Sequence, residues 1–147
     1  MRLYVDLNCF NRPFDDQEQA RVRQETEAIF GILNRVVEGA DSLIWSEVLT
    51  FENSRHPKPD RRHEIGLWQD RAVENVVASS EVERRAQTIS AKGIGPLDAA
   101  HLACAEVGAA EVFLTCDDEL IKQAQRLGLN FRVLNPVDYW KEVSRHG

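Results

Sequence analysis

The sequence has 147 residues, of which 43% are hydrophobic, and it carries a formal net charge of -6 with a pI of about 5.2. This length and this hydrophobic content predict a single globular domain over residues 1–147 and exclude a mainly disordered chain. The acidic charge disfavours a protein that binds nucleic acid tightly and without specificity, unless basic residues cluster locally or a metal ion neutralises the acids.

The first third of the chain predicts strands that alternate with helices. Short apolar runs bounded by polar residues are typical of buried strands, and periodic apolar residues are typical of amphipathic helices. The predicted elements are a strand over Leu3–Val5, a helix over residues 22–37 that stops near Gly39, a strand over Ser42–Trp45 and a short helix capped by Ser46.

The middle of the chain predicts helices separated by turn-forming residues, and Pro57 and Pro59 interrupt it first. The predicted helices are a segment over Arg61–Val73, a helix that begins at the capping-box pair Ser80 and Glu83, and a helix over Leu97–Val107 that follows Pro96.

The last third predicts two more strands, Glu111–Thr115 and Phe131–Leu134. Between them, Asp117 opens a helix that Gly128 ends, and Pro136 begins a terminal helix. Strands that alternate with helices in this way predict an α/β fold. We therefore expect a three-layer α/β/α sandwich with a mostly parallel central sheet.

Four acidic residues are expected to meet at one edge of this sheet, because ligands bind beyond the carboxyl ends of parallel strands. Asp6 directly follows the first strand, and Asp117 lies just beyond the third. Glu52 lies on the helix after the second strand, and Asp98 lies in the first turn of a later helix. We call these residues the four acids. Carboxylate oxygens are hard ligands, so the pattern points to a site for Mg²⁺ or Mn²⁺.

Three of the four acids also have a purely structural explanation. Asp117 can cap its helix, Asp98 can interact favourably with the dipole of its helix, and Glu52 can be a solvated helix residue. Asp6 is harder to explain in this way, since an acid that directly follows a buried strand points into the expected ligand crevice.

Four segments taken together resemble the PIN domain family, which is known for ribonucleases and for the toxins of many bacterial and archaeal toxin–antitoxin pairs. The segments are LYVDLNCFNRPFDD, IWSEVLTFENS, GPLDAAHLACA and FLTCDDEL, and the resemblance extends from Arg2 to about Val137. It implies that the four acids are both the metal ligands and the catalytic residues. It also implies hydrolysis of RNA by a metal-activated water, leaving 5′-phosphate and 3′-hydroxyl ends, a possible antitoxin partner and a homodimer.

Two further polar residues are candidates for positioning the substrate. Many members of the family have Thr or Ser directly after the first acid, whereas here Leu7 stands there and Asn8 supplies the polar group, which could orient a water molecule or a phosphate. Asp118, which follows the fourth acid, could also lie near the site.

Two residues compete with the four acids for a place in the site. Glu47 is an alternative to Glu52, but its place in a first helical turn is sufficiently explained by the helix dipole. His101 follows Asp98 by three residues on the same helical side. Its apolar neighbours favour a buried structural histidine over a metal ligand or a general base.

The densest basic cluster of the sequence lies over Arg55–His63. Its arginines Arg61 and Arg62 could contact phosphates beside the acidic site. An equally open explanation is that these basic residues are solvated in a loop and at the start of a helix.

Cysteine content and hydropathy favour a soluble cytoplasmic protein without membrane association. The three cysteines, Cys9, Cys104 and Cys116, have no CxxC spacing, which disfavours a disulfide framework and a structural zinc site. The N-terminal apolar run is too short for a signal peptide, and no stretch reaches the length of a membrane span.

Other classes of protein also place an acid after a buried strand. Phosphotransfer proteins of the haloacid-dehalogenase type need a second aspartate where Asn8 stands, and receiver domains need an early pair of acids and a lysine without a convincing match here. A further alternative is a catalytically inactive PIN-like module that acts through binding another protein. Four intact acids argue against that alternative, and metal-dependent cleavage of RNA would separate it from an enzyme.

Overall fold

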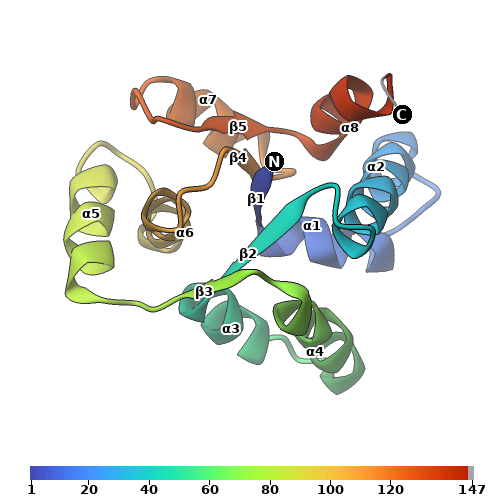
Figure 1. Ribbon diagram of the computed structural model, residues 1–147, viewed down its shortest axis with the longest axis horizontal. Coiled ribbons are helices and arrows are strands. Elements are labelled where there is room, and N and C mark those ends of the chain that lie inside the picture. The colour runs from blue at the N-terminus through green and yellow to red at the C-terminus, as the bar shows by residue number, and fades with distance from the viewer. Residues whose placement is uncertain (146–147) are drawn as a thin grey trace.

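Five parallel strands form one central sheet in the computed structural model, which describes residues 1–145 (Figure 1). The order across the sheet is β3-β2-β1-β4-β5. The strands are β1 (Arg2–Val5), β2 (Ser42–Ser46), β3 (Glu74–Val76), β4 (Val112–Leu114) and β5 (Arg132–Leu134). All four neighbouring pairs are parallel, as expected when helices connect successive strands.

Helices cover both faces of the sheet, which confirms the predicted α/β sandwich. Figure 1 shows α5 and α6 on one side of the strands and α1, α2 and α8 on the other. The helices of residues 1–145 are α1 (Leu7–Asn11), α2 (Ala20–Val37), α3 (Glu47–Ser54), α4 (Pro59–Gly66), α5 (Ser80–Ser90), α6 (Pro96–Val107), α7 (Asp118–Gln125) and α8 (Pro136–Ser144), with the 3-10 helices η1 (Arg12–Phe14) and η2 (Leu67–Arg71). Within the same residues, no helix combines the length and the apolar character that crossing a membrane requires.

The central strand β1 is buried after its first residue, and its neighbour β4 is buried throughout. Residues 3–5 of β1 are at most 3% exposed, and residues 112–114 of β4 are at most 1% exposed. Full burial of an aliphatic or aromatic side chain stabilises a fold by ~1.5–3 kcal/mol. The residues that directly follow β1 and β4 are therefore held rigidly at the same edge of the sheet.

The four predicted strands are present as β1, β2, β4 and β5, with ends that differ by one residue. The fifth strand, β3, lies directly after the segment over Arg61–Val73 that was predicted as one helix. That prediction is wrong, because α4 ends at Gly66 and η2 ends at Arg71. β3 has only three residues, two of them exposed, at the edge of the sheet. It is defined by its pairing with β2 and not by an apolar run of its own.

Two helix starts also differ from the sequence-based expectation. The hydroxyl of Ser79, and not that of Ser80, caps α5 by accepting the N–H of Val82 at 3.3 Å. Helix α1 was not predicted, because five residues are too few to show a helical period. It begins directly after Asp6, whose side chain caps it.

Candidate metal centre

Asp6 lies where β1 ends and is held by two parts of the fold. It is 5% exposed. Its Oδ1 accepts the N–H of Leu7 at 2.8 Å. Its Oδ2 accepts the hydroxyl of Thr115 at 2.9 Å and the side-chain amide of Asn8 at 3.2 Å. The orientation of the carboxylate is therefore fixed both by the turn from β1 into α1 and by the residue that follows β4.

Asn8 joins these same two parts of the fold. Its Nδ2 also donates to Thr115 Oγ1 at 3.0 Å, and its Oδ1 accepts the N–H of Cys116 at 3.1 Å. Both amide hydrogens are thus used within the protein, one on Asp6 and one on Thr115. In this arrangement, Asn8 supports Asp6, and a direct contact from its amide to phosphate would require one of these bonds to break.

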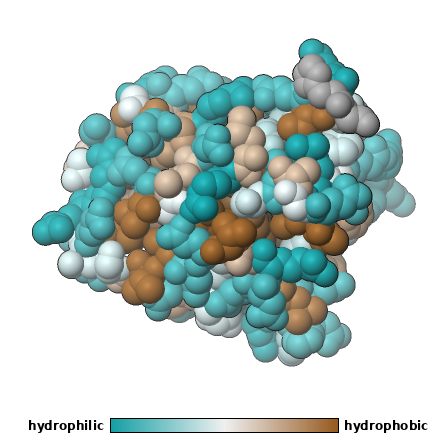
Figure 2. All heavy atoms as spheres, in the orientation of Figure 1, coloured by the Kyte–Doolittle hydropathy of each residue, from teal (hydrophilic) through white to brown (hydrophobic). Residues whose placement is uncertain are grey.

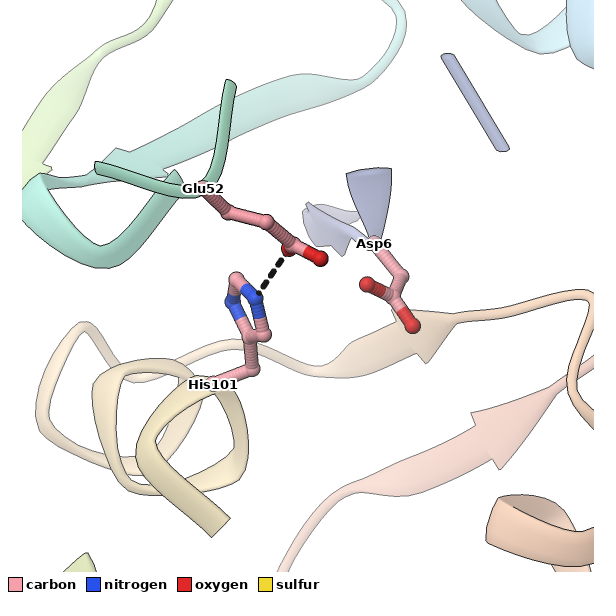
Figure 3. A group of neighbouring side chains, drawn as sticks. All are labelled: Asp6, Glu52 and His101. Atoms are coloured by element: carbon pink, nitrogen blue, oxygen red, sulfur yellow. Dashed lines mark hydrogen bonds and ion pairs between the residues drawn. The ribbon is translucent and has the colours of Figure 1, made fainter. Parts of the chain in front are cut away.

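Glu52 and His101 bring two further elements to Asp6. Glu52 comes from α3, His101 comes from α6, and Figure 3 shows both side chains and Asp6 gathered in one place. The distance from Glu52 Oε1 to His101 Nε2 is 2.8 Å. One potential ligand atom from each of these residues lies within 4.8 Å of the others, a spacing that a metal ion could bridge. His101 is 1% exposed, which confirms the prediction that it is buried.

The structure distinguishes Glu52 from its competitor Glu47. The Oε1 atom of Glu47 accepts the backbone N–H of Ala78 at 2.9 Å, on the exposed side of the helix. Glu52 lies one and a half turns further along α3 and contacts the residues around Asp6. Of the two glutamates, Glu52 is therefore the one in the acidic cluster.

Asp98 and Asp117 lie at the starts of two helices. Asp98 is half-buried in the first turn of α6. Asp117 caps α7, since its Oδ1 accepts the N–H groups of Glu119 and Leu120 at 3.0 and 3.2 Å. Within the described residues, neither joins the group of three at the 4.8 Å spacing. One carboxylate oxygen of Asp117 therefore has the predicted capping role, and the other takes no part in capping.

The acids nevertheless influence one another electrostatically. Burial raises the pKa of Asp6 to about 6, the charges of Glu52 and Asp98 add to the increase, and His101 and the Thr115 hydroxyl oppose it. Burial of a carboxylate and the presence of like charges both disfavour ionisation. Asp6 thus occupies a position where negative charge is held without full compensation.

The pKa of Asp98 is affected by the same group of charges. Burial and then the charge of Asp117 raise the pKa of Asp98, Glu52 adds to the increase, and His101 opposes it. All four acids are therefore coupled in one electrostatic group. Hard oxygen donors in a region of uncompensated negative charge fit a small divalent cation such as Mg²⁺ or Mn²⁺.

Residues 3–126 match the sequence model of the PIN domain. The chain belongs to the PIN domain family. The matched range includes all four acids of this PIN domain and the elements from β1 to the last turn of α7. The resemblance drawn from the sequence motifs is thereby confirmed.

Two solved structures share the fold of this PIN domain. VapBC2 from Rickettsia felis, bound to a DNA fragment from its promoter, matches with a TM-score of 0.62 and 12% identity over 92% of this chain and 98% of that chain. DNA-bound VapBC from Salmonella typhimurium matches with a TM-score of 0.55 and 12% identity over the same shares of the two chains. At this identity the likeness concerns the fold alone. No curated protein matches the sequence of this PIN domain.

Asp118 is engaged by an arginine that the sequence did not indicate. The guanidinium of Arg21, on α2, donates to both carboxylate oxygens of Asp118 at 2.7 and 2.8 Å, and to the backbone oxygen of Cys116 at 3.3 Å. This bond to Arg21 lowers the pKa of Asp118. Arg21 thus ties α2 to the first residue of α7 and to the loop before it, and the carboxylate of Asp118 is occupied by this contact.

Arg61 and Arg62 are partly buried and are packed against nearby backbone. The guanidinium of Arg61 lies 4.9 Å from the centre of the Phe14 ring and donates to the Phe14 carbonyl at 3.3 Å. The guanidinium of Arg62 donates to the carbonyl of His56. These contacts fix α4 against η1 and against the loop that precedes α4, and they do not involve the four acids.

The residues around the acids that the sequence analysis missed are Tyr4 and Thr115. Thr115 lies inside the predicted strand over Glu111–Thr115, and its contact with Asp6 depends on the pairing of β1 with β4. Tyr4 did carry an indication of its own, because the hydroxyl of a tyrosine in a buried strand needs a hydrogen-bond partner. In this PIN domain it has two, Ser46 and His101.

Proposed function

We propose that this PIN domain is a metal-dependent endoribonuclease that hydrolyses phosphodiester bonds of RNA. The observation that carries the proposal is the position of Asp6: a buried carboxylate with a pKa raised to about 6, at the carboxyl end of the central strand, beside Glu52 and His101. A perturbed carboxylate at the ligand-binding edge of a parallel sheet is typical of a functional site.

The four acids would hold Mg²⁺ or Mn²⁺. When bound, the ion would lower the pKa of a water molecule and neutralise charge on the phosphoryl oxygens. The protein itself orients the carboxylates. Thr115 and Asn8 contact Asp6, His101 contacts Glu52, and Asp117 is bound to the first turn of α7. No serine or cysteine nucleophile is needed for this chemistry.

The substrate would approach from the side of the basic cluster over Arg55–His63. Arg61 and Arg62 belong to this cluster, and we propose that they contact phosphates on either side of the scissile bond. We assign Asn8 to positioning Asp6, and Asp118 to holding Arg21 at the rim of the site.

The test is cleavage of mixed RNA by the purified protein in Mg²⁺ or Mn²⁺ and in EDTA. Cleavage should require the metal and should be lost in Asp6→Asn. Cleavage that persists in EDTA or in Asp6→Asn protein would indicate a contaminating nuclease. Wild-type protein that binds a partner but cleaves no RNA would favour the inactive PIN-like module.

We further propose that the protein is the toxin of a toxin–antitoxin pair. The two VapBC structures with the same fold support this proposal. So does an apolar groove of about 510 Å³ between α1, α2 and α4, lined by side chains that include Phe14, Phe30, Leu33 and Trp68. Phe30 is 58% exposed. Figure 2 shows groups of hydrophobic residues among hydrophilic ones on the face of the molecule that it draws.

Exposed apolar surface of this kind is typical of a binding site for a protein partner. Co-expression with the product of a small neighbouring gene should yield a complex that no longer cleaves RNA, and Phe30→Asp should weaken that complex. An unchanged complex with Phe30→Asp would exclude the groove as the partner site.

We also propose that the protein forms a homodimer, and light scattering of the purified protein tests this proposal.

A further inference from the structure

A buried chain of hydrogen bonds runs behind the metal centre and ends on Glu52. Ser46 Oγ lies 2.7 Å from Tyr4 Oη, Tyr4 Oη lies 2.7 Å from His101 Nδ1, and His101 Nε2 lies 2.8 Å from Glu52 Oε1. Ser46, Tyr4 and His101 are at most 1% exposed. The chain connects β2, β1 and α6 with α3, all of which are fixed by the core.

The hydrogen atoms of this hydrogen-bond chain can be placed in a self-consistent arrangement. An ionised carboxylate only accepts hydrogen bonds, so His101 Nε2 carries a hydrogen that it donates to Glu52. In a neutral imidazole, Nδ1 then accepts the hydroxyl of Tyr4. The oxygen of Tyr4 accepts the hydroxyl of Ser46, and Ser46 Oγ accepts the N–H of Leu49 at 3.1 Å.

Every donor in that arrangement has an acceptor. With a charged imidazolium, the bonds of Tyr4 would reverse, so that Nδ1–H would donate to Tyr4 and Tyr4 would donate to Ser46. The bond from His101 Nε2–H to Glu52 is the same in both cases. The position of the Glu52 carboxylate therefore does not depend on the ionisation of His101.

Glu52 has a long, flexible side chain that needs such a support. This side chain is 30% exposed, and Glu52 is the third-last residue of α3. A glutamate side chain loses rotamer entropy when it is fixed in one conformation. The bond from His101 fixes one carboxylate oxygen and leaves the second oxygen free.

His101 itself is unsuited to be a ligand in this arrangement. Both of its ring nitrogens are hydrogen bonded, one to Tyr4 and one to Glu52. Hydrogen bonds to metal-binding carboxylates from residues one step further away orient those carboxylates, and their loss typically reduces metal affinity on the order of 10–100-fold.

We propose that His101 is a positioning residue, which holds the Glu52 carboxylate beside Asp6 through Nε2–H and is itself oriented by Tyr4 and Ser46. This inference rests on the proposed function, in which Glu52 is a metal ligand. It extends that function to residues that touch neither metal nor substrate.

The first experiment needs no metal. NMR of the metal-free protein should show a slowly exchanging, downfield imidazole Nε2–H resonance of His101, which disappears in Glu52→Ala. A resonance that is absent from the wild type, or unchanged in Glu52→Ala, would overturn the positioning proposal whatever the metal does.

The second experiment is calorimetric titration with Mn²⁺. His101→Ala should lower the affinity on the order of 10–100-fold, and His101→Gln, whose amide can still donate to Glu52, should restore part of it. Leu102→Ala is the matched control: it removes a fully buried side chain from the same helix and should leave the Mn²⁺ affinity unchanged. Circular dichroism verifies that each variant is folded.

The outcomes separate the two proposals. A wild type that shows the His101 resonance but binds no Mn²⁺ would overturn the proposed metal-dependent function and, with it, the metal-directed role of His101. A wild type that binds Mn²⁺, together with a His101→Ala variant of equal affinity, would overturn the positioning role alone.

Discussion

The hydroxyl of Thr115 donates to the carboxylate of Asp6 over 2.9 Å, although 109 residues separate the two in the sequence. The contact is possible because β1 and β4 are parallel neighbours, with Val5 opposite Leu114, so that their carboxyl ends lie side by side. The central acid of the candidate site is thus oriented by the strand next to its own.

Thr115→Val should raise the pKa of Asp6 further, because the Thr115 hydroxyl stabilises the ionised carboxylate. The loss of a hydrogen bond to a charged group should also destabilise the fold by ~1.5–3 kcal/mol. Carboxyl carbon chemical shifts of the metal-free protein measure the pKa. Thr115→Ser keeps the hydroxyl and should leave the pKa unchanged. An equal shift in both variants would mean that the hydrogen bond is not its cause.

The stability of the metal-free protein should depend on pH through Asp6. The pKa of Asp6 rises from 3.8 to about 6 on folding, so the folded protein binds this proton more tightly than the unfolded chain does. The stabilising contribution is complete below the unfolded value and is lost as the pH rises through about 6, with a size of about 3 kcal/mol. Urea unfolding in EDTA from about pH 4 to about pH 7 should therefore show a steeper loss in the wild type than in Asp6→Asn. Parallel curves for the two proteins would contradict the shift.

Asp98→Asn should stabilise the metal-free protein and abolish cleavage. Burial and the charges of Asp117 and Glu52 make ionised Asp98 unfavourable at neutral pH. In Mn²⁺ the order of stability should reverse, because the wild type gains RT ln(1 + [L]/Kd) from binding and the variant gains less. Thermal melting in EDTA and in Mn²⁺ tests the predicted order of stability without and with metal. If Asp98 only favours the dipole of α6, the variant should be less stable by up to ~1 kcal/mol and melt at a lower temperature, by the same amount in EDTA and in Mn²⁺.

Glu52→Gln and Glu47→Gln form a matched pair on the same helix. Glu52→Gln removes the charge of a proposed metal ligand and should strongly reduce Mn²⁺ affinity and RNA cleavage, whereas Glu47→Gln should change neither. The carbonyl oxygen of glutamine can still accept the N–H of Ala78, so the second variant keeps its structural contact. The assignment of Glu52 fails if the larger loss belongs to Glu47→Gln.

Replacement of Arg61 and Arg62 by Ala should weaken RNA binding and flatten its salt dependence by about 0.7 per lost phosphate contact. Binding is measured in the Asp6→Asn background, so that the RNA remains intact. Arg126→Ala, an exposed position at the C-terminal end of α7, serves as the control and should leave the slope unchanged. An unaltered slope in the double variant would assign Arg61 and Arg62 to their contacts with Phe14 and His56.

Much of the fold could be predicted from the sequence because it is encoded locally. The apolar runs of β1 and β4 are buried on both faces, and the caps of α3 and α7 by Ser46 and Asp117 follow from residue type and position. The parallel arrangement then indicated the edge at which acids after β1 and β4 would lie.

The rest depends on contacts between distant segments. Strand β3 has almost no apolar pattern and exists through its pairing with β2. The partner of Asp118 is Arg21, 97 residues earlier, and the partner of Glu52 is His101, 49 residues later. No local pattern indicates which polar side chains face each other across the edge of a sheet, so these pairs could not be predicted.

The long separation between Asp6 and Thr115 also affects how the protein is made. A ribosome that adds about 5–20 residues per second takes roughly 5–20 s to advance from the first residue to the second. Throughout that time β1 lacks its neighbour β4, and Asp6 lacks the hydroxyl that orients it. The arrangement around Asp6 therefore cannot form on a growing chain until Thr115 has been added and β4 can pair with β1.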